Sequence, residues 1–414
     1  MNKIWAGFLF VLVFSACVPA VTAAPTQTPT FPPAPTIQPT LTPTPVIKSI
    51  AQRIADRSFP SVFQSWSEAD NLPNELPIKT VARHDLVWYV AEQLGLEWDN
   101  PYAGLAASFT PASLLVAQST RKTLLGYNPN LILLAAVQYR DAQPNWLPQD
   151  SSWWAHDAKG NRTSGPAEYG VYLLDTHNPS FRAQVVAQAK ALIDTGDFDG
   201  VMLDWWDDSD PDRISLVKEI RSAIGEDKLI IVNSNWHKDP NSAPYINGIY
   251  MEDCFWYPQK PVCLMPLTPQ EWQETSDTLL WAEANLRQPH INALETWYVN
   301  SRDDLNRMRA TTTLALTHSN GYTLFAGPND LPGEDHLHNW YPFWDKTLGK
   351  PLAAMIKRPD GAFQREFEGG TVVYNPMGNG KITVVFSDPR RSAATGQSAT
   401  TFTLDAMDGD LYLK

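Results

Sequence analysis

The chain has 414 residues, of which 43% are hydrophobic and 19% are charged, and its formal net charge at pH 7 is −13. The hydrophobic content supports a folded core, and the acidic balance excludes nucleic acid and anionic lipid as partners of the folded part. The 16 tryptophans favour a neutral ligand with apolar faces.

The chain starts with the pattern of a secretory signal peptide, predicted to cover residues 1–16. After one positive residue, an apolar run (4–14) that is too short to span a bilayer leads into small residues before Cys17. This pattern resembles a bacterial lipobox, so we predict lipidation of Cys17 and an extracytoplasmic, membrane-anchored location, at the cell surface or in the periplasm. Ordinary signal cleavage after Ala23 or Ala24 is the alternative.

Residues 17–47 are predicted to be a Pro/Thr-rich tether. From residue 24 to about residue 46 nearly every residue is Pro, Thr or small, so this segment cannot bury a core. In polyproline geometry about 23 residues reach roughly 70 Å, which would hold a folded domain clear of a membrane.

Short apolar strands and amphipathic helices alternate from about residue 81 to residue 348. Most of the strands are continuously apolar, as expected of parallel strands that are covered on both faces. The eight predicted strands are 85–90, 131–139, 171–175, 200–204, 229–233, 248–252, 291–295 and 322–326. Eight such units in about 270 residues predict an α/β fold, a (β/α)8 TIM barrel over residues 48–358. A doubly wound open sheet is the alternative, but no glycine-rich phosphate turn follows any predicted strand.

Several predicted helices have clear start signals. Asn178 can cap a helix whose first residue is proline, and Asp210 can do the same for the next helix, which Gly225 would end. Thr268 has a glutamate three residues later, which is the spacing of a capping box. After the barrel, residues 359–414 have strand and turn patterns that predict a small, β-sandwich-like all-β domain.

The predicted strand ends carry an unusual number of carboxylates and aromatic side chains. Asp204 ends a buried strand and is followed by Trp205 and Trp206, and Glu252 ends another strand. Burying an unpaired charge is expensive, and the active site of a TIM barrel lies at the C-terminal ends of its strands, so these positions indicate function. The predicted substrate-binding residues are Tyr139, Asp175, Trp205, Trp206, Asn235, Glu295 and Trp297.

Other polar residues have simpler interpretations. Asp175 can instead cap the helix that follows it, and the acidic residues 207–212 are more typical of a solvated turn and helix cap than of a calcium site. None of the eight histidines belongs to a His-Glu-x-x-His motif, so a metal-dependent hydrolase is a weak alternative. No metal or cofactor is predicted. Cys254 and Cys263 flank a short segment and, outside the cytoplasm, are expected to form a disulfide.

Residues 173–208, LLDTHNPSFRAQVVAQAKALIDTGDFDGVMLDWWDD, resemble glycoside hydrolases related to endo-α-1,4-polygalactosaminidase. The resemblance implies a hydrolase barrel with an aspartate at the fourth strand end, matched by Asp204, and a glutamate at the sixth, matched by Glu252. The ending REFEGGTVVYNP, residues 365–376, resembles the β domain that follows the barrel in one branch of such proteins. The doubled tryptophan after Asp204 departs from the Asn or Asp that is usual there.

We therefore predict an extracytoplasmic glycoside hydrolase that cuts an α-linked poly- or oligosaccharide. By resemblance, Asp204 would be the nucleophile and Glu252 the general acid/base, the pair of carboxylates that glycoside hydrolysis needs. Pairing of Asp204 with Glu295 is the alternative, and it suits barrels that cut β-linked sugars. The alternative function is a non-catalytic carbohydrate-binding surface lipoprotein that has kept the barrel.

Overall fold

The computed structural model describes residues 48–165, 169–252, 267–298, 301–327 and 336–414. The segment Lys48–Lys414 forms one compact unit. Cys17, Cys254 and Cys263 lie outside the described residues, so the predicted lipidation and disulfide stay predictions. Among the residues described, no helix is both long enough and apolar enough to cross a bilayer.

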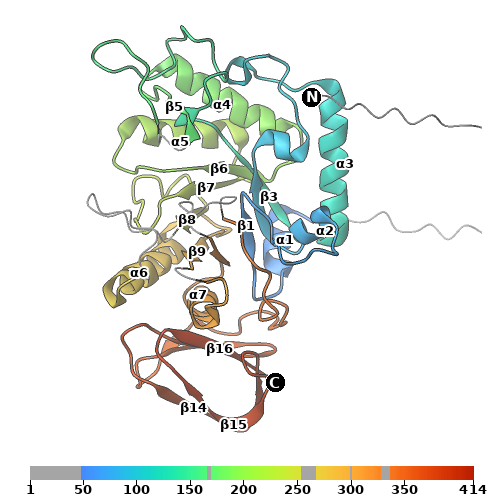
Figure 1. Cartoon of the computed structure of the whole chain (residues 1–414), viewed down its shortest axis with the longest axis vertical. Coiled ribbons are helices and arrows are strands. Elements are labelled where there is room, and N and C mark those ends of the chain that lie inside the picture. Colours follow the sequence, from blue (N-terminus) through green and yellow to red (C-terminus); the bar gives the residue numbers. More distant parts are fainter. Residues whose placement is uncertain (1–47, 166–168, 253–266, 299–300, 328–335) are drawn as a thin grey trace, which may run out of the picture. The chain divides into compact units, whose positions relative to one another are not determined.

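Eight parallel strands form a barrel, as the sequence predicted (Figure 1). The two end strands are joined by a parallel bridge between Val62 and Thr323, and the Thr323 N–H donates to the Ser61 carbonyl over 3.0 Å. In sheet order the strands are β1 (Phe63–Ser65), β2 (Leu86–Tyr89), β3 (Ile132–Ala136), β6 (Gly200–Leu203), β7 (Leu229–Asn233), β8 (Gly248–Glu252), β9 (Ala293–Trp297) and β10 (Tyr322–Ala326).

One predicted barrel strand is wrong and one barrel strand was missed. Residues 171–175 do not enter the barrel, because β5 (Tyr172–Leu173) pairs antiparallel with β4 (Asp141–Ala142) in the connection between β3 and α4. The first barrel strand is instead β1, whose three residues Phe-Gln-Ser show no apolar run. These two errors cancel in the count, so Asp204 still follows the fourth strand of the barrel.

Helices cover the outside of the barrel, and their predicted caps are confirmed. Asn178 and Asp210 accept hydrogen bonds from the first turns of their helices, and Thr268 forms the predicted capping box. Residues 234–247, between β7 and β8, contain no helix, so the fifth unit departs from the expected alternation. The α-helices are α1 (Ile50–Asp56), α2 (Pro77–Val81), α3 (Pro111–Tyr127), α4 (Pro179–Asp194), α5 (Pro211–Ile224), α6 (Pro269–Asn285) and α7 (Leu305–His318), with 3-10 turns η1 (Ala91–Leu94) and η2 (Ala103–Leu105).

The start of β6 is fixed by a buried ion pair. Asp199 is 2% exposed and accepts hydrogen bonds from Arg53 Nη1 at 3.0 Å and from Arg121 Nη2 at 2.8 Å. The next residue, Gly200, lies so close to β7 that a Cβ there would collide with the carbonyl of Leu229. These contacts set the position of the strand that ends at Asp204.

We expect Asp199→Asn to lower the free energy of unfolding by about 3–5 kcal/mol, because the change leaves the buried Arg53 and the partly buried Arg121 without their counter-charge. Burial alone would raise the pKa of Asp199, but the two arginines hold it below its ordinary value. Its stabilisation is therefore present at neutral pH and is lost as the pH falls through the folded pKa. Urea unfolding against pH measures both effects. The control Asp194→Asn breaks an exposed pair with Lys190 and should cost under about 1 kcal/mol.

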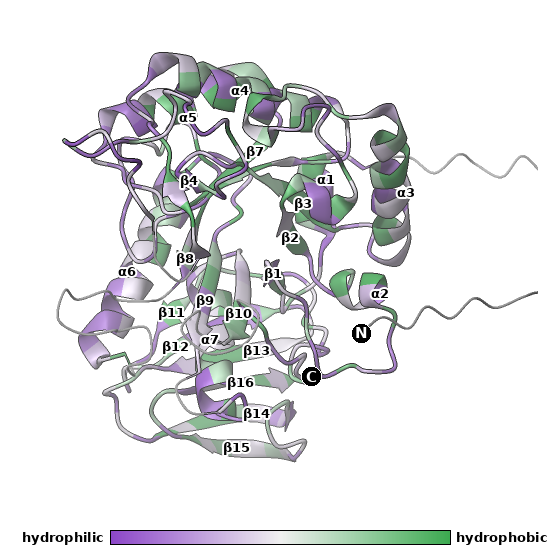
Figure 2. Cartoon of the chain, turned by 45° about the horizontal axis from the view of Figure 1, so that its top comes forward, coloured by the Kyte–Doolittle hydropathy of each residue, from purple (hydrophilic) through white to green (hydrophobic). Residues whose placement is uncertain are grey.

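The C-terminal residues form one six-stranded antiparallel sheet that packs on α7. Arg309 on α7 holds Asp408 through two hydrogen bonds of 2.8 Å, which fixes the sheet to the barrel. Figure 2 shows both hydrophobic and hydrophilic stretches along these strands. In sheet order they are β11 (Ile356–Lys357), β12 (Phe363–Phe367), β13 (Gly370–Asn375), β16 (Asp408–Leu413), β14 (Ile382–Ser392) and β15 (Ser398–Leu404).

Candidate active site

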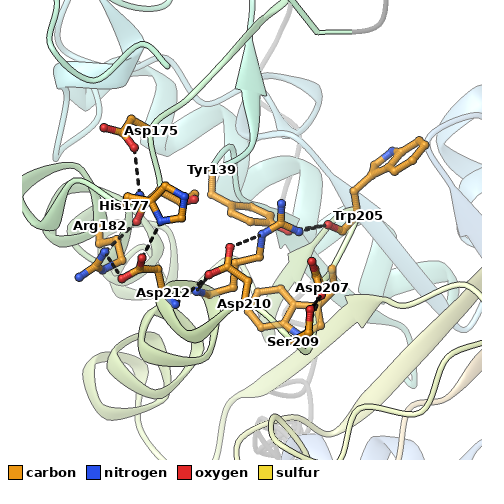
Figure 3. A network of polar contacts seen from close by, with 12 residues as sticks. Tyr139, Asp175, His177, Arg182, Trp205, Asp207, Ser209, Asp210 and Asp212 are labelled. Atoms are coloured by element: carbon orange, nitrogen blue, oxygen red, sulfur yellow. Dashed lines mark hydrogen bonds and ion pairs between the residues drawn. The ribbon is translucent and has the colours of Figure 1, made fainter. Parts of the chain in front are cut away.

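Asp204 lies directly after β6, at the C-terminal end of the barrel, and is partly exposed. Its backbone is held by Tyr139, whose single hydroxyl proton is shared between the Asp204 carbonyl at 2.5 Å and the Trp205 carbonyl at 3.1 Å. Arg213 also donates to the Trp205 carbonyl, at 2.6 Å (Figure 3). Three hydrogen bonds thus fix the turn that presents the Asp204 carboxylate.

Asn233, the last residue of β7, joins Asp204 to Glu252. Its Nδ2 donates to Asp204 Oδ1 and to Glu252 Oε2, each at 2.8 Å. Its Oδ1 accepts from the backbone N–H of Asn235 at 3.1 Å, which fixes the orientation of the amide group. Because both carboxylate oxygens lie 2.8 Å from one nitrogen, they are no more than twice that distance apart.

Glu252 and Glu295 are register partners in neighbouring strands, so their side chains point the same way. Glu252 is 6% exposed and Glu295 is fully buried. His336 Nδ1 lies 2.9 Å from Glu295 Oε1, and its Nε2 lies 3.7 Å from Glu252 Oε1. Tyr250 donates to the other oxygen of Glu295 at 2.5 Å.

The two bridged carboxylates have different electrostatic surroundings. Burial, reinforced by the charges of Asp204 and Glu295 and opposed by His336, raises the pKa of Glu252 to about 8. Burial also raises the pKa of Asp204 above its ordinary value, against the Asn233 hydrogen bond and the charges of Arg140 and His336. Glu252 is therefore largely protonated at neutral pH.

Backbone strain is concentrated at this end of the barrel. Trp66, Trp205, Asn235 and His336 all have left-handed backbone angles, with φ between 51° and 58°. Such angles are costly for bulky residues and persist where the surroundings enforce them, commonly at active sites.

Two cavities meet at the Trp205 side chain. The first, of about 80 Å³, is lined by Asp204, Tyr139 and Trp66 among others, and the second, of about 550 Å³, includes Asp175 in its lining. Trp205 and Arg140 line both cavities, and the Arg140 guanidinium lies 4.4 Å from the indole ring.

The predicted substrate-binding residues fall into two groups. Trp205 is 49% exposed, and Asp175, Trp206 and Asn235 line the larger cavity beside it, although Trp206 itself is only 8% exposed and donates to Ser242. The other group is buried. Glu295 and Trp297 line neither cavity, and Trp297, which is 3% exposed, donates to Glu295 Oε1 at 3.0 Å. Tyr139 is 2% exposed and lines the first cavity.

Three residues of the site were not among the predicted site residues, namely Asn233, Tyr250 and His336. Asn233 had a usable signal, because it ends the strand between those that carry Asp204 and Glu252. Tyr250 had a weaker signal, since it precedes Glu252 by two residues and so faces the same side of the strand. His336 had only its close spacing to His338 as a signal, because a segment after β10 brings it to the site.

A small cluster of possible metal ligands lies at the start of α5. His177, Asp210 and Asp212 bring ligand atoms within 4.8 Å of one another. Figure 3 shows His177 and Arg182 meeting at Asp212, with distances of 2.6 and 2.7 Å. Asp210 caps α5 and faces Arg213 at 3.4 Å. These contacts explain the cluster as a helix cap neutralised by arginines.

Residues 213–371 match the sequence profile of a family described as hypothetical glycosyl hydrolase family 15. The match agrees with the predicted resemblance at the level of glycoside hydrolase, and it does not extend to polygalactosaminidase. No curated protein matches the chain.

The fold is similar to that of solved amylases. The maltogenic α-amylase AmyB from Thermotoga neapolitana aligns with 85% of this chain and 98% of its own, at 12% identity and a TM-score of 0.52. An α-amylase from Malbranchea cinnamomea aligns with 88% of this chain and 97% of its own, at 12% identity and a TM-score of 0.49. At 12% identity, the similarity to AmyB supports the fold alone.

The family match, on a barrel with paired carboxylates at its mouth, identifies the enzyme class as glycoside hydrolase.

Proposed function

We propose that the protein is an extracytoplasmic, retaining glycosidase that cleaves an α-linked poly- or oligosaccharide, with Asp204 as nucleophile and Glu252 as general acid/base. Asp204 would attack the anomeric carbon while Glu252 gives its proton to the leaving oxygen. Glu252 would then take a proton from water, and the resulting hydroxide would release the sugar from Asp204 with its original configuration.

The observation that carries this proposal is the Asn233 bridge. Carboxyl groups lie about 5–5.5 Å apart in retaining glycosidases and about 6.5–9.5 Å apart in inverting ones, which need room for a water. The bridged oxygens of Asp204 and Glu252 are each 2.8 Å from the same nitrogen, and this close approach supports the retaining arrangement.

The roles follow from the surroundings of each carboxylate. Glu252 is the more buried and keeps its proton near neutrality, as a general acid must. Asp204 faces the Asn233 amide and the charge of Arg140, which favour its ionised form. Glu295 is a poorer partner for Asp204, since Tyr250, Trp297 and His336 surround its carboxylate.

The substrate class and location rest on different grounds. Cavities lie on both sides of Trp205, and the larger is about 550 Å³, which favours an oligomer or polymer over a single sugar. The α linkage rests on the resemblance of residues 173–208. The extracytoplasmic location rests on the signal pattern and tether, with Cys17 as the proposed site of the lipid anchor.

The first test is release of reducing sugar, by soluble protein starting at residue 48, from a panel of α- and β-linked polysaccharides. Proton NMR of the first product formed should show the anomeric configuration of the substrate. Release with inversion would contradict the retaining mechanism. A polymer that binds but is never cut would favour the binding lipoprotein.

We expect kcat/KM to follow a bell-shaped pH dependence. Because Glu252 must be protonated and its pKa is about 8, activity should fall as the pH rises through about 8. Because Asp204 must be ionised and its pKa is raised, the acid limb should lie above the ordinary range of an aspartate. Initial rates at low substrate concentration in constant-ionic-strength buffers measure both limbs. A profile that is still rising at pH 9 would contradict the assignment of Glu252.

Trp205→Ala should lower kcat/KM for an oligosaccharide roughly 5- to 30-fold, mainly through KM, because a sugar ring loses about 1–2 kcal/mol of aromatic contact. Trp205→Phe keeps an aromatic face and should recover most of the affinity. Steady-state kinetics of both variants test this. Equal losses in the two variants would point instead to the strained backbone at Trp205.

A further inference from the structure

Two glutamates lie side by side in the barrel mouth with little access to water. Glu252 and Glu295 face each other in register on β8 and β9, and neighbouring strands are about 4.8 Å apart. They are 6% and 0% exposed. When Glu252 ionises as it gives up its proton, two like charges at this separation in a buried site would repel strongly, so this step needs a positive group between them.

His336 occupies the position between the two glutamates. It is 1% exposed, and each of its ring nitrogens faces a carboxylate oxygen, Glu295 at 2.9 Å and Glu252 at 3.7 Å. Trp297 lies edge-on to the imidazole with ring centroids 6.3 Å apart. The left-handed backbone at His336, with φ of 57°, indicates that the surroundings enforce this placement.

The proton count of the ring follows from these contacts. Glu295 Oε1 accepts hydrogen bonds, so His336 Nδ1 carries a proton. Once Glu252 has given up its proton, its oxygens also only accept, so the Nε2 that faces it must carry a proton as well. The Tyr250 hydroxyl donates to Glu295 and leaves the histidine proton in place. The ring is then an imidazolium whose firm anchor is Glu295.

We propose that His336 is a positively charged positioning residue, anchored on Glu295, that orients Glu252 and stabilises its carboxylate once the proton has passed to the leaving group. The inference rests on the proposed role of Glu252 as general acid/base. It assigns Glu295 the role of holding the histidine instead of binding sugar.

The charge balance of the site is consistent with this role. An imidazolium between two buried carboxylates lets Glu252 ionise during the reaction without leaving two unscreened negative charges beside Asp204. His338 hydrogen-bonds the carbonyl of His336 at 3.1 Å and therefore fixes the backbone on the other side. Among the described residues, the titratable groups that interact with the His336 side chain include Glu252 and Tyr250 on β8, Glu295 on β9, Asp204 after β6, and His338.

The experiment compares His336→Gln with the unchanged protein, using the full chain. Glutamine keeps a hydrogen-bonding side chain and removes the charge. An opposite charge at this distance lowers a carboxyl pKa by roughly 1–3 units, so its loss should move the alkaline limb of kcat/KM upward by about one pH unit or more. The rate should fall more for sugar leaving groups than for activated aryl leaving groups, because proton donation becomes harder. A purely structural role would lower kcat at every pH without moving the limb, and that result would overturn the proposal.

Two titrations decide the question without any substrate. Carbon-13 NMR of labelled glutamate, with Glu252→Gln to assign the signal, should show that the Glu252 pKa rises in His336→Gln. Nitrogen-15 NMR of the unchanged protein should show both ring nitrogens of His336 protonated at pH 7, and this holds even if the variant fails to fold. A neutral ring, or an unmoved Glu252 titration in the folded variant, would overturn the proposal. Failure to cut any polymer would remove the proposed function alone.

Discussion

Asp204→Asn should abolish glycoside hydrolysis while leaving the barrel folded. Loss of a nucleophile costs on the order of 10⁴-fold or more in kcat, because no covalent intermediate can form. The amide keeps an oxygen that can accept the Asn233 hydrogen bond. Because burial raises the pKa of Asp204, its charge opposes folding at neutral pH, so removing the charge should leave the free energy of unfolding unchanged or slightly higher.

The measurement combines rates with covalent trapping. A 2-deoxy-2-fluoro glycoside of the cleaved sugar, with an activated leaving group, should label the unchanged protein on the peptide that contains Asp204 and should not label Asp204→Asn. The control is Asp194→Asn on the outer surface of α4, which should keep full activity. A label on Glu252 or Glu295 would show that another carboxylate is the nucleophile.

The position of Asp204 could be predicted because it depends on a local signal. An apolar strand followed by a carboxylate and a turn places that carboxylate at a strand end, whichever strands flank it. The prediction therefore survived two errors in the strand list. The three residues of β1 show no apolar run, and residues 171–175 show one without belonging to the barrel.

The contacts between site residues could not be predicted in the same way. Trp205 and Trp206 are adjacent and chemically identical in sequence, yet one is 49% exposed and the other 8%. The left-handed backbone at Trp205 separates them, and it is set by Tyr139 and Arg213 from elsewhere in the chain. His336 reaches Glu295 across 41 positions of sequence, so no local pattern indicates it.

The structure also changes the interpretation of Glu295. From sequence it was a sugar ligand or a rival catalytic partner, because it ends a predicted strand. In the fold it is fully buried and its two oxygens receive Tyr250, Trp297 and His336. A carboxylate at a strand end can thus hold neighbouring side chains of the site without being exposed itself. Glu295 is fully buried, whereas Glu252 is 6% exposed.

Glu252→Gln should lower kcat/KM for sugar leaving groups by roughly 10²–10⁴-fold, because the leaving oxygen departs without a proton. The loss should be much smaller for a dinitrophenyl glycoside, whose leaving group needs no proton. The alkaline limb near pH 8 should vanish, since the group that titrates there is gone. Added azide should restore turnover of the dinitrophenyl glycoside and give a glycosyl azide of retained configuration, because azide needs no base to attack the intermediate.

Glu295→Gln is the matched control, since it makes the same change at the register partner of Glu252. This variant keeps the proton donor, so it should retain an alkaline limb, fail to respond to azide, and lose activity to a similar degree for good and poor leaving groups. If Glu295→Gln showed leaving-group dependence and azide rescue, and Glu252→Gln showed neither, then Glu295 on the seventh strand would be the general acid/base. The Asn233 bridge argues against that outcome, because it ties Asp204 to Glu252 and makes no contact with Glu295 among its described hydrogen bonds.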